Sequence, residues 1–154
     1  MSASEPLALA LRLLAARDRS QAELAAALER RGIAASDIAE VLERCRELGY
    51  VDDRRYALER ARALLRDGRA AGARIRLDLR RRGIDPELAQ EALRAAEVEA
   101  APEQVLRELL ARRFPDFDYA RAEARDKRRV IAFLQRRGFS PAQIFALFRE
   151  EKDL

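Results

Sequence analysis

One phrase occurs three times along this chain of 154 residues, and it limits the folds that the chain can adopt. The copies read LERRGIAASDIAEVL from Leu28, LRRRGIDPELAQEAL from Leu79 and LQRRGFSPAQIFALF from Leu134. Aligned on their glycines, which lie 51 and 55 residues apart, all three have two arginines before the glycine and a leucine four residues before it. Fixed internal repetition is typical of repeat architectures. The chain is therefore predicted to consist of three tandem copies of one structural unit.

The glycine in each copy is predicted to end a helix. A glycine with positive φ commonly closes a helix in a Schellman motif. In this motif the side chain of the residue after the glycine contacts that of the residue four positions before the glycine. The predicted contacts are Leu28–Ile33, Leu79–Ile84 and Leu134–Phe139. The two arginines then occupy the last turn, where the helix dipole favours an exposed cation by about 0.3–1 kcal/mol.

A second helix is predicted to begin soon after each glycine. Asp85-Pro86 and Ser140-Pro141 match an N-cap followed by proline at the first helical position. In the first copy Ala34 occupies the cap position, so Ser36 is expected to provide the cap instead. Two further pairs match capping boxes, Ser20 with Glu23 and Ser140 with Gln143.

Each unit is predicted to hold three helices. One further helical stretch precedes each pair, at Leu7–Arg17, Arg54–Gly68 and Pro102–Phe114. Ala, Leu, Arg and Glu dominate the composition and β-branched residues are sparse, which favours an all-α fold. The units are predicted to span residues 1–51, 52–99 and 100–154. Because a unit of this size has little core of its own, we expect an elongated, curved array of packed units, each resembling a helix-turn-helix.

The composition argues against several kinds of catalytic or metal site. Without any His, the chain lacks the commonest general base and neutral metal ligand. The single cysteine, Cys45, is predicted to pack in a helix as a small hydrophobic residue. The GRAAGAR segment from Gly68 lacks the preceding strand and the Lys-Ser/Thr ending of a phosphate loop. Asp52 or Asp53 is expected to cap a helix, with a metal site formed by the pair as the less favoured alternative. No catalytic residue, cofactor or metal is predicted, and an enzyme is not expected.

The sequence also predicts a location. No apolar run approaches the ~18 residues that span a membrane. Residues 1–11 lack the basic segment and cleavage site of a secretory signal. We therefore expect a cytoplasmic protein that binds no membrane.

Two windows concentrate the positive charge. Residues 69–82 hold six arginines against one acidic residue, and residues 121–137 hold seven basic residues against two. Each window falls on the predicted middle helix of its unit, where phosphate or an acidic protein surface is the expected partner. Solvated helix faces in an arginine-rich protein are the alternative. The candidate partner-binding or DNA-binding residues are Arg74, Arg76, Arg80, Arg81, Arg82, Arg125, Lys127, Arg128, Arg129 and Arg136.

Within this set, the paired arginines carry a second interpretation. Arg81 and Arg82 have counterparts in every unit, so they are interpreted in large part as charges at the end of a helix. The less repeated Arg74, Arg76 and Arg80 are the favoured contacts with a partner.

Four segments resemble successive blocks of the RecX family, the bacterial regulators of the RecA recombinase. They are LALRLLAARDRSQAELAAALERRGI, LGYVDDRRYA, RIRLDLRRRGID and FLQRRGFSPAQI, and they extend over nearly the whole chain. The resemblance implies a curved array of three three-helix repeats that lodges in the groove of RecA filaments on DNA. It also implies a non-enzymatic regulator that usually suppresses ATP hydrolysis and strand exchange, and some members of the family bind DNA.

Two alternatives to a RecA regulator remain from the residues alone. A stand-alone DNA-binding protein would insert the second helix of each helix-turn-helix into the major groove. The candidate helices PELAQEALRAAE and ASDIAEVLERC are acidic or neutral and poor in residues that read bases. A helical scaffold that binds another acidic protein is supported by composition only. The expected partner is the RecA filament, with single- or double-stranded DNA as a further possibility, and a monomer is expected.

Overall fold

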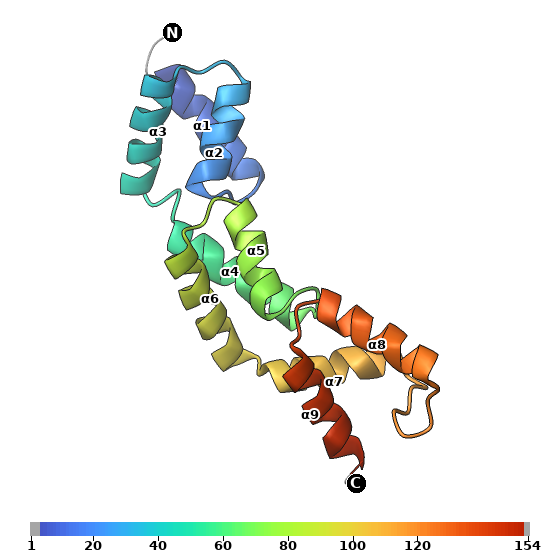
Figure 1. Cartoon of the computed structure of the whole chain (residues 1–154). Helices are drawn as coiled ribbons and strands as arrows, with labels where there is room; N and C mark the ends of the chain where they lie inside the picture. The colour runs from blue at the N-terminus through green and yellow to red at the C-terminus, as the bar shows by residue number, and fades with distance from the viewer. Residues whose placement is uncertain (1–3, 153–154) are drawn as a thin grey trace.

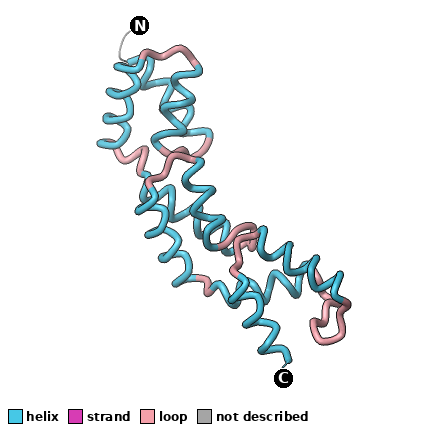
Figure 2. The backbone as a smooth tube through the Cα atoms, in the orientation of Figure 1, coloured by secondary structure: helices cyan, strands magenta, loops and turns pink. Residues whose placement is uncertain are grey.

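The computed structural model describes residues 4–152, which form nine α-helices and no strand (Figures 1 and 2). The helices are α1 (Ser4–Ala16), α2 (Gln21–Arg30), α3 (Ala35–Glu47), α4 (Asp53–Arg66), α5 (Gly72–Arg81), α6 (Pro86–Glu99), α7 (Pro102–Arg113), α8 (Ala124–Arg136) and α9 (Pro141–Lys152). The predicted all-α class is therefore confirmed. Residues 1–3 and 153–154, at the outer ends of the predicted first and third units, lie outside the described residues.

The helices follow one another in three groups of three along an elongated, curved molecule (Figure 1). We refer to α1–α3 as repeat 1, α4–α6 as repeat 2 and α7–α9 as repeat 3. In Figure 1 the middle helices α2, α5 and α8 follow one edge of the array, and the third helices follow the other. The predicted boundaries after residues 51 and 99 stay predictions.

The predicted helix ends are confirmed in all three repeats. The φ angles are 82° at Gly32, 82° at Gly83 and 108° at Gly138. The N–H after each glycine donates to the carbonyl of the leucine five residues earlier: Ile33 to Leu28 at 3.2 Å, Ile84 to Leu79 at 3.0 Å and Phe139 to Leu134 at 3.3 Å. This is the hydrogen bond of a Schellman motif. All six of these side chains are buried.

Three of the predicted caps are also confirmed. Ser20 and Ser140 form complete capping boxes at the starts of α2 and α9. Asp85 accepts a hydrogen bond from the N–H of Glu87 at 2.9 Å, with Pro86 at the first helical position.

Two predictions about caps need a correction or a refinement. The prediction for Ser36 is wrong: α3 begins at Ala35 with Ala34 as its N-cap, so Ser36 lies inside the helix and Ala34 provides no side-chain hydrogen bond. Of the two neighbouring aspartates, Asp52 caps α4. Asp53 instead accepts a hydrogen bond from the N–H of Gln21, in repeat 1, at 2.9 Å.

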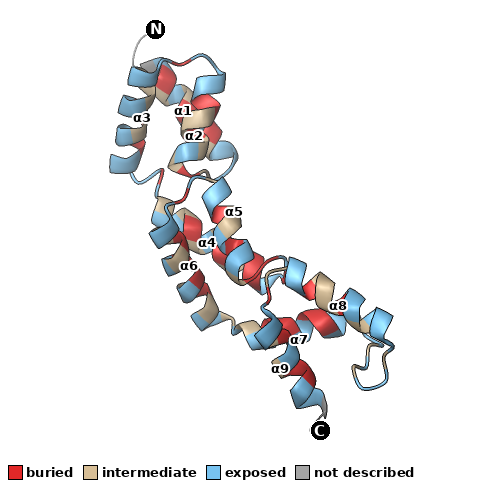
Figure 3. Cartoon of the chain, viewed as in Figure 1, coloured by how far each residue is buried: buried red, intermediate tan, exposed pale blue. Residues whose placement is uncertain are grey.

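The buried side chains of the described residues form two separate hydrophobic clusters (Figure 3). One lies within repeat 1 and its connections, from Ala10 to Val51, and includes Cys45, whose predicted packing role is confirmed. The other extends without interruption through repeats 2 and 3, from Ala57 to Phe148. Repeat 1 therefore has its own hydrophobic core, and repeats 2 and 3 share a second one.

The two junctions between repeats bring equivalent segments together. In each, the turn that ends a middle helix meets the start of the middle helix of the preceding repeat. The Ser20 hydroxyl donates to the Arg82 carbonyl at 2.5 Å, and the Ala71 N–H donates to the Arg137 carbonyl at 2.7 Å. Each acceptor is the residue just before the helix-ending glycine. The repeated turn thus ends a helix and also joins neighbouring repeats.

Candidate functional site

Helix α5 exposes all four of its arginines. It buries Ile75 and Leu79 against the core, and this apolar stripe turns the basic positions outward. The exposed arginines of α5 are Arg74, Arg76, Arg80 and Arg81. Arg76 donates a hydrogen bond to the Gln90 side chain at 3.3 Å. None of the four forms an ion pair with an acidic residue of the described chain, so their charges are open to a partner.

Helix α8 repeats this pattern. It buries Val130 and Leu134, which are equivalent to Ile75 and Leu79. The exposed arginines of α8 are Arg125, Arg128, Arg129 and Arg136. We call these four and the four exposed arginines of α5 the basic surface. Lys127 lies apart from it, half-buried, with its ammonium group 4.5 Å from the centre of the Tyr119 ring.

The junction between repeats 2 and 3 brings the two basic windows together. Arg74 of α5 and Arg136 of α8 line one shallow groove of about 430 Å³, with Ala73, Leu77, Gln135 and Gly138 forming the rest of its lining. Sequence reasoning placed both arginines in the candidate set but did not predict that they share a groove. Their proximity depends on the junction and not on their own helices.

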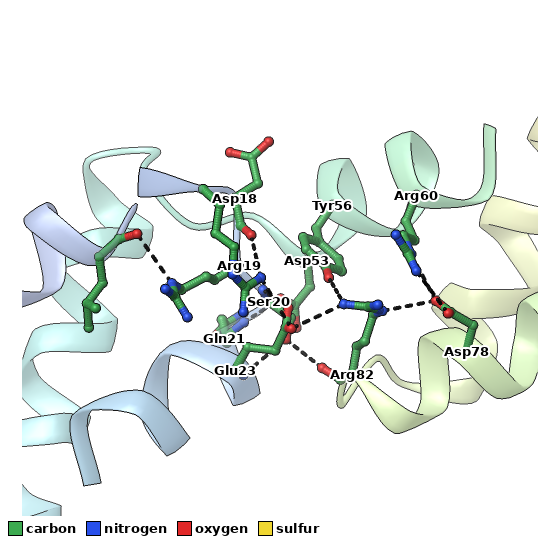
Figure 4. Close-up of polar contacts among 12 residues, drawn as sticks. Asp18, Arg19, Ser20, Gln21, Glu23, Asp53, Tyr56, Arg60, Asp78 and Arg82 are labelled. Atoms are coloured by element: carbon green, nitrogen blue, oxygen red, sulfur yellow. Dashed lines mark hydrogen bonds and ion pairs between the residues drawn. The ribbon is translucent and has the colours of Figure 1, made fainter. Parts of the chain in front are cut away.

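Arg82, the remaining candidate, is committed to contacts inside the molecule (Figure 4). Its guanidinium donates to Asp78 at 3.0 Å, to the Tyr56 hydroxyl at 3.2 Å and to Glu23 of repeat 1 at 3.4 Å. Its side chain is 29% exposed. Arg82 therefore lies outside the basic surface.

Arg137 occupies the equivalent position in repeat 3 and also reaches into the preceding repeat. It donates to the Gly68 carbonyl of repeat 2 at 2.9 Å and stacks over the Phe133 ring at 4.8 Å. In repeat 1, Arg31 donates to the carbonyl of Ala27 in its own helix. In repeats 2 and 3 the second arginine of the pair thus contacts the preceding repeat. Sequence reasoning missed this role, although recurrence at one position was the signal.

The contacts around Arg82 keep two carboxylates charged. Burial raises the pKa of the Glu23 carboxyl, but hydrogen bonds from the Ser20 N–H and the Tyr56 hydroxyl, with two arginines nearby, outweigh burial and lower it. Burial likewise raises the pKa of Asp78, and the neighbouring Arg60 and Arg82 outweigh it, so this pKa is also lowered. Arg60 forms a two-pronged pair with Asp78 at 3.0 and 3.1 Å.

Four helices on the two edges of the array differ strongly in charge, whereas α2 carries one basic residue against two acidic and α9 carries two of each. Helix α5 carries four basic residues against one acidic residue, and α8 carries five against one. On the other edge, α3 carries four acidic residues against two basic, and α6 carries four against one. A surface with this separation of charge attracts an anionic partner to the edge formed by α5 and α8.

The described residues offer no grouped metal ligands. Between residues 4 and 152, no three His, Cys, Asp or Glu side chains converge in a way that would hold a metal ion. None of the helices in this range is both long enough and apolar enough to cross a membrane.

The fold and surface define a class of protein: an all-α array of three-helix repeats whose second and third middle helices are basic. The domain models of RecX identify the family. Its first, second and third three-helix domains match residues 7–45, 52–93 and 102–148. The chain belongs to the RecX family.

Individual relatives agree with this assignment over nearly the whole chain. The regulatory protein RecX of Syntrophotalea carbinolica is 45% identical over 143 residues, covering 93% of this chain and 94% of its own length. That of Trichlorobacter lovleyi is 38% identical and covers 92% of each chain. The crystal structure of RecX from Lactobacillus salivarius has a TM-score of 0.78 at 25% identity, covering 99% of this chain and 97% of that one.

Proposed function

We propose that this protein binds RecA filaments on DNA and regulates RecA, lowering its ATPase activity and strand exchange. Membership of a family of regulatory proteins supports this function. The main structural support is the basic surface of α5 and α8, which we propose as the contact with the filament. Its eight exposed arginines have no acidic partner in the described chain. The protein acts as a cytoplasmic monomer and catalyses no reaction.

The shape of the array suits a filament. Contacts spread along an elongated molecule reinforce one another, because each contact that forms raises the effective concentration of the next. No deep pocket is needed for such binding. Exposed arginines can pair with phosphates or with acidic side chains, and both interactions weaken as salt is added.

Charge reversal of the basic surface tests the proposal. The test variant changes Arg74, Arg76 and Arg80 to glutamate, all on α5. The matched control makes the same change at three exposed arginines of first or third helices, for which no ion pair is found in the described residues: Arg12, Arg94 and Arg149. Both variants alter the net charge equally, so a difference between them reports position and not total charge.

The readouts are the DNA-dependent ATPase and strand exchange of RecA, with circular dichroism to verify folding. The unchanged protein and the control variant should inhibit both activities, and the α5 variant should lose most of its inhibition. If the unchanged protein neither binds filaments nor alters either rate, the proposed function is wrong. If the two variants behave alike, α5 is not the contact surface.

A stand-alone DNA-binding protein finds less support. A helix-turn-helix reader would place α3 or α6 in the major groove, and the excess of acidic residues on both helices would repel phosphates. Tight, sequence-dependent binding to free duplex DNA in the absence of RecA would favour this alternative.

A further inference from the structure

The two junctions between repeats differ in what surrounds the hydrogen bond to the carbonyl before the helix-ending glycine. Repeats 2 and 3 share one hydrophobic core, and Gly68 of repeat 2 packs closely against Leu109 of repeat 3. Separating these two repeats would expose apolar side chains to water, which is unfavourable in proportion to the area exposed. Repeats 2 and 3 are therefore held at a fixed angle.

The junction between repeats 1 and 2 is polar. No buried apolar cluster of the described chain extends across it. Its main contacts are the hydrogen bonds from Ser20 to the Arg82 carbonyl and from Gln21 to Asp53, and the ion pair of Arg82 with Glu23 (Figure 4). We call these five residues, with Tyr56, the polar junction.

Polar contacts of this kind can be exchanged for contacts with water. Gln21, Glu23, Asp53 and Arg82 are partly exposed, and hydrogen bonds and ion pairs at such positions are replaced by solvent at little net change in free energy. The Ser20 hydroxyl is buried and gains water only when the junction opens. Inter-domain contacts of this type leave relative motion as the default expectation, unless the interface is large and apolar. The polar junction therefore stabilises one angle between repeats 1 and 2 but permits other angles.

The covalent connection at this junction is suited to bending. α3 ends at Glu47 and α4 begins at Asp53. Between them, Gly49 has a φ of 76°, and a methyl group added to it would meet no heavy atom within 4 Å. On the opposite side, Gly83 lies so close to Ala22 that even a methyl group on Gly83 would overlap the Ala22 side chain. Repeat 1 therefore cannot move closer to repeat 2 at this contact.

We propose that the polar junction is a hinge about which repeat 1 turns as one body relative to a second rigid body formed by repeats 2 and 3. The hinge separates two parts of different charge: residues 1–51 hold 7 basic and 8 acidic groups, and residues 52–154 hold 24 and 19. The basic surface thus lies entirely on the second body. The hinge does not rest on the proposed function, because it concerns the free protein.

Distance measurements between spin labels test the hinge directly. The buried Cys45 is replaced by alanine, and exposed positions on the third helices receive cysteine in pairs. Ala39→Cys with Arg94→Cys spans the polar junction, and Arg94→Cys with Ala142→Cys lies within the second body. The distance distribution across the polar junction should be broader by about twofold or more, because only this junction permits rigid-body motion. Equal widths would overturn the proposal.

The variant Arg82→Met tests whether the polar junction sets the width of the distance distribution. Arg82→Met removes the ion pair with Glu23 but keeps an apolar side chain of similar length. It should broaden the distribution across the polar junction further and leave the pair within the second body unchanged. Broadening of both pairs, or of neither, would show that the polar junction does not control the angle.

Hydrogen exchange of the unmodified protein provides a measurement that depends on no variant. Amides of Leu24 and Leu28 should exchange in one cooperative group, and those of Ile75, Leu79 and Leu134 in another, since each core opens as a unit. The same protection and the same denaturant dependence for all five would show a single body and contradict the hinge.

Discussion

Alanine substitution of the three helix-ending glycines separates the cost of ending a helix from the cost of joining two repeats. Gly32 and Gly83 have the same φ of 82°, so alanine at either position meets the same backbone strain, about 1–2 kcal/mol for a left-handed L residue. At Gly32 the added methyl group meets no heavy atom within 4 Å. Gly32→Ala should therefore cost only this strain.

The structure predicts a larger loss at the junctions. The methyl group of Gly83→Ala would overlap the side chain of Ala22, and forced overpacking adds about 1–3 kcal/mol. The methyl group of Gly138→Ala would overlap the backbone carbonyl of Ala71 inside the shared core, where neither repeat can turn aside. The predicted order of destabilisation is Gly32→Ala, then Gly83→Ala, then Gly138→Ala. Gly83→Val should be worse than Gly83→Ala, because β-branched residues tolerate positive φ poorly.

Chemical denaturation followed by helical circular dichroism measures these losses. The double variant Ala22→Gly with Gly83→Ala provides the decisive control, because it removes the overlapping methyl group. It should lose less stability than the two single changes added together, a coupling of about 1–2 kcal/mol. Equal losses for Gly32→Ala and Gly83→Ala, or simple additivity in the double variant, would refute the packing described for the first junction.

Three further predictions concern the polar residues at the same junction. Arg82→Ala should destabilise the fold by about 1–3 kcal/mol, because Glu23 and its neighbours lose a hydrogen-bond donor. Arg81→Ala, at an exposed position, should change the free energy of unfolding little. The urea midpoints of the two variants measure the difference. Ser20→Ala should destabilise the fold by about 0.5–2 kcal/mol because the helix loses its cap. It should lower the thermal midpoint more than Ser140→Ala does, because Ser20 is fully buried and also bonds the Arg82 carbonyl. The reverse order would show that the bond between the repeats is unimportant. Because folding lowers the pKa of Glu23, its carboxylate stabilises the fold at a pH above the usual pKa of 4.5, and this contribution is lost as the pH falls through the lower folded pKa. The stability of Glu23→Gln should therefore fall less steeply with acid than that of the unchanged protein. An unchanged slope would contradict the lowered pKa.

The sequence predicted the features that depend on neighbouring residues. A helix ends where glycine adopts positive φ, and it begins where a short polar side chain reaches the next backbone N–H, so Gly83, Asp85 and the Ser140 capping box were identified correctly. The error at Ser36 came from assuming that every helix has a side-chain cap. Helix α3 begins without one, after Ala34.

The features that depend on distant residues could not be predicted in this way. Arg81 and Arg82 are adjacent and chemically identical, yet one is exposed and the other bonds Glu23, 59 residues away. The difference arises from which side of α5 faces repeat 1. The groove shared by Arg74 and Arg136 likewise depends on the junction between repeats 2 and 3. Sequence analysis therefore found the helices that hold the candidate site but could not separate exposed arginines from those used inside the array.

A cryo-electron microscopy reconstruction of RecA filaments on single-stranded DNA, saturated with this protein, tests the central claim most directly. The account predicts continuous density in the filament groove, with α5 and α8 facing the filament and the arginines of the basic surface against phosphate or acidic side chains. Filaments without added density, or bound molecules that face the filament with the acidic helices α3 and α6 and leave α5 and α8 in solvent, would contradict it.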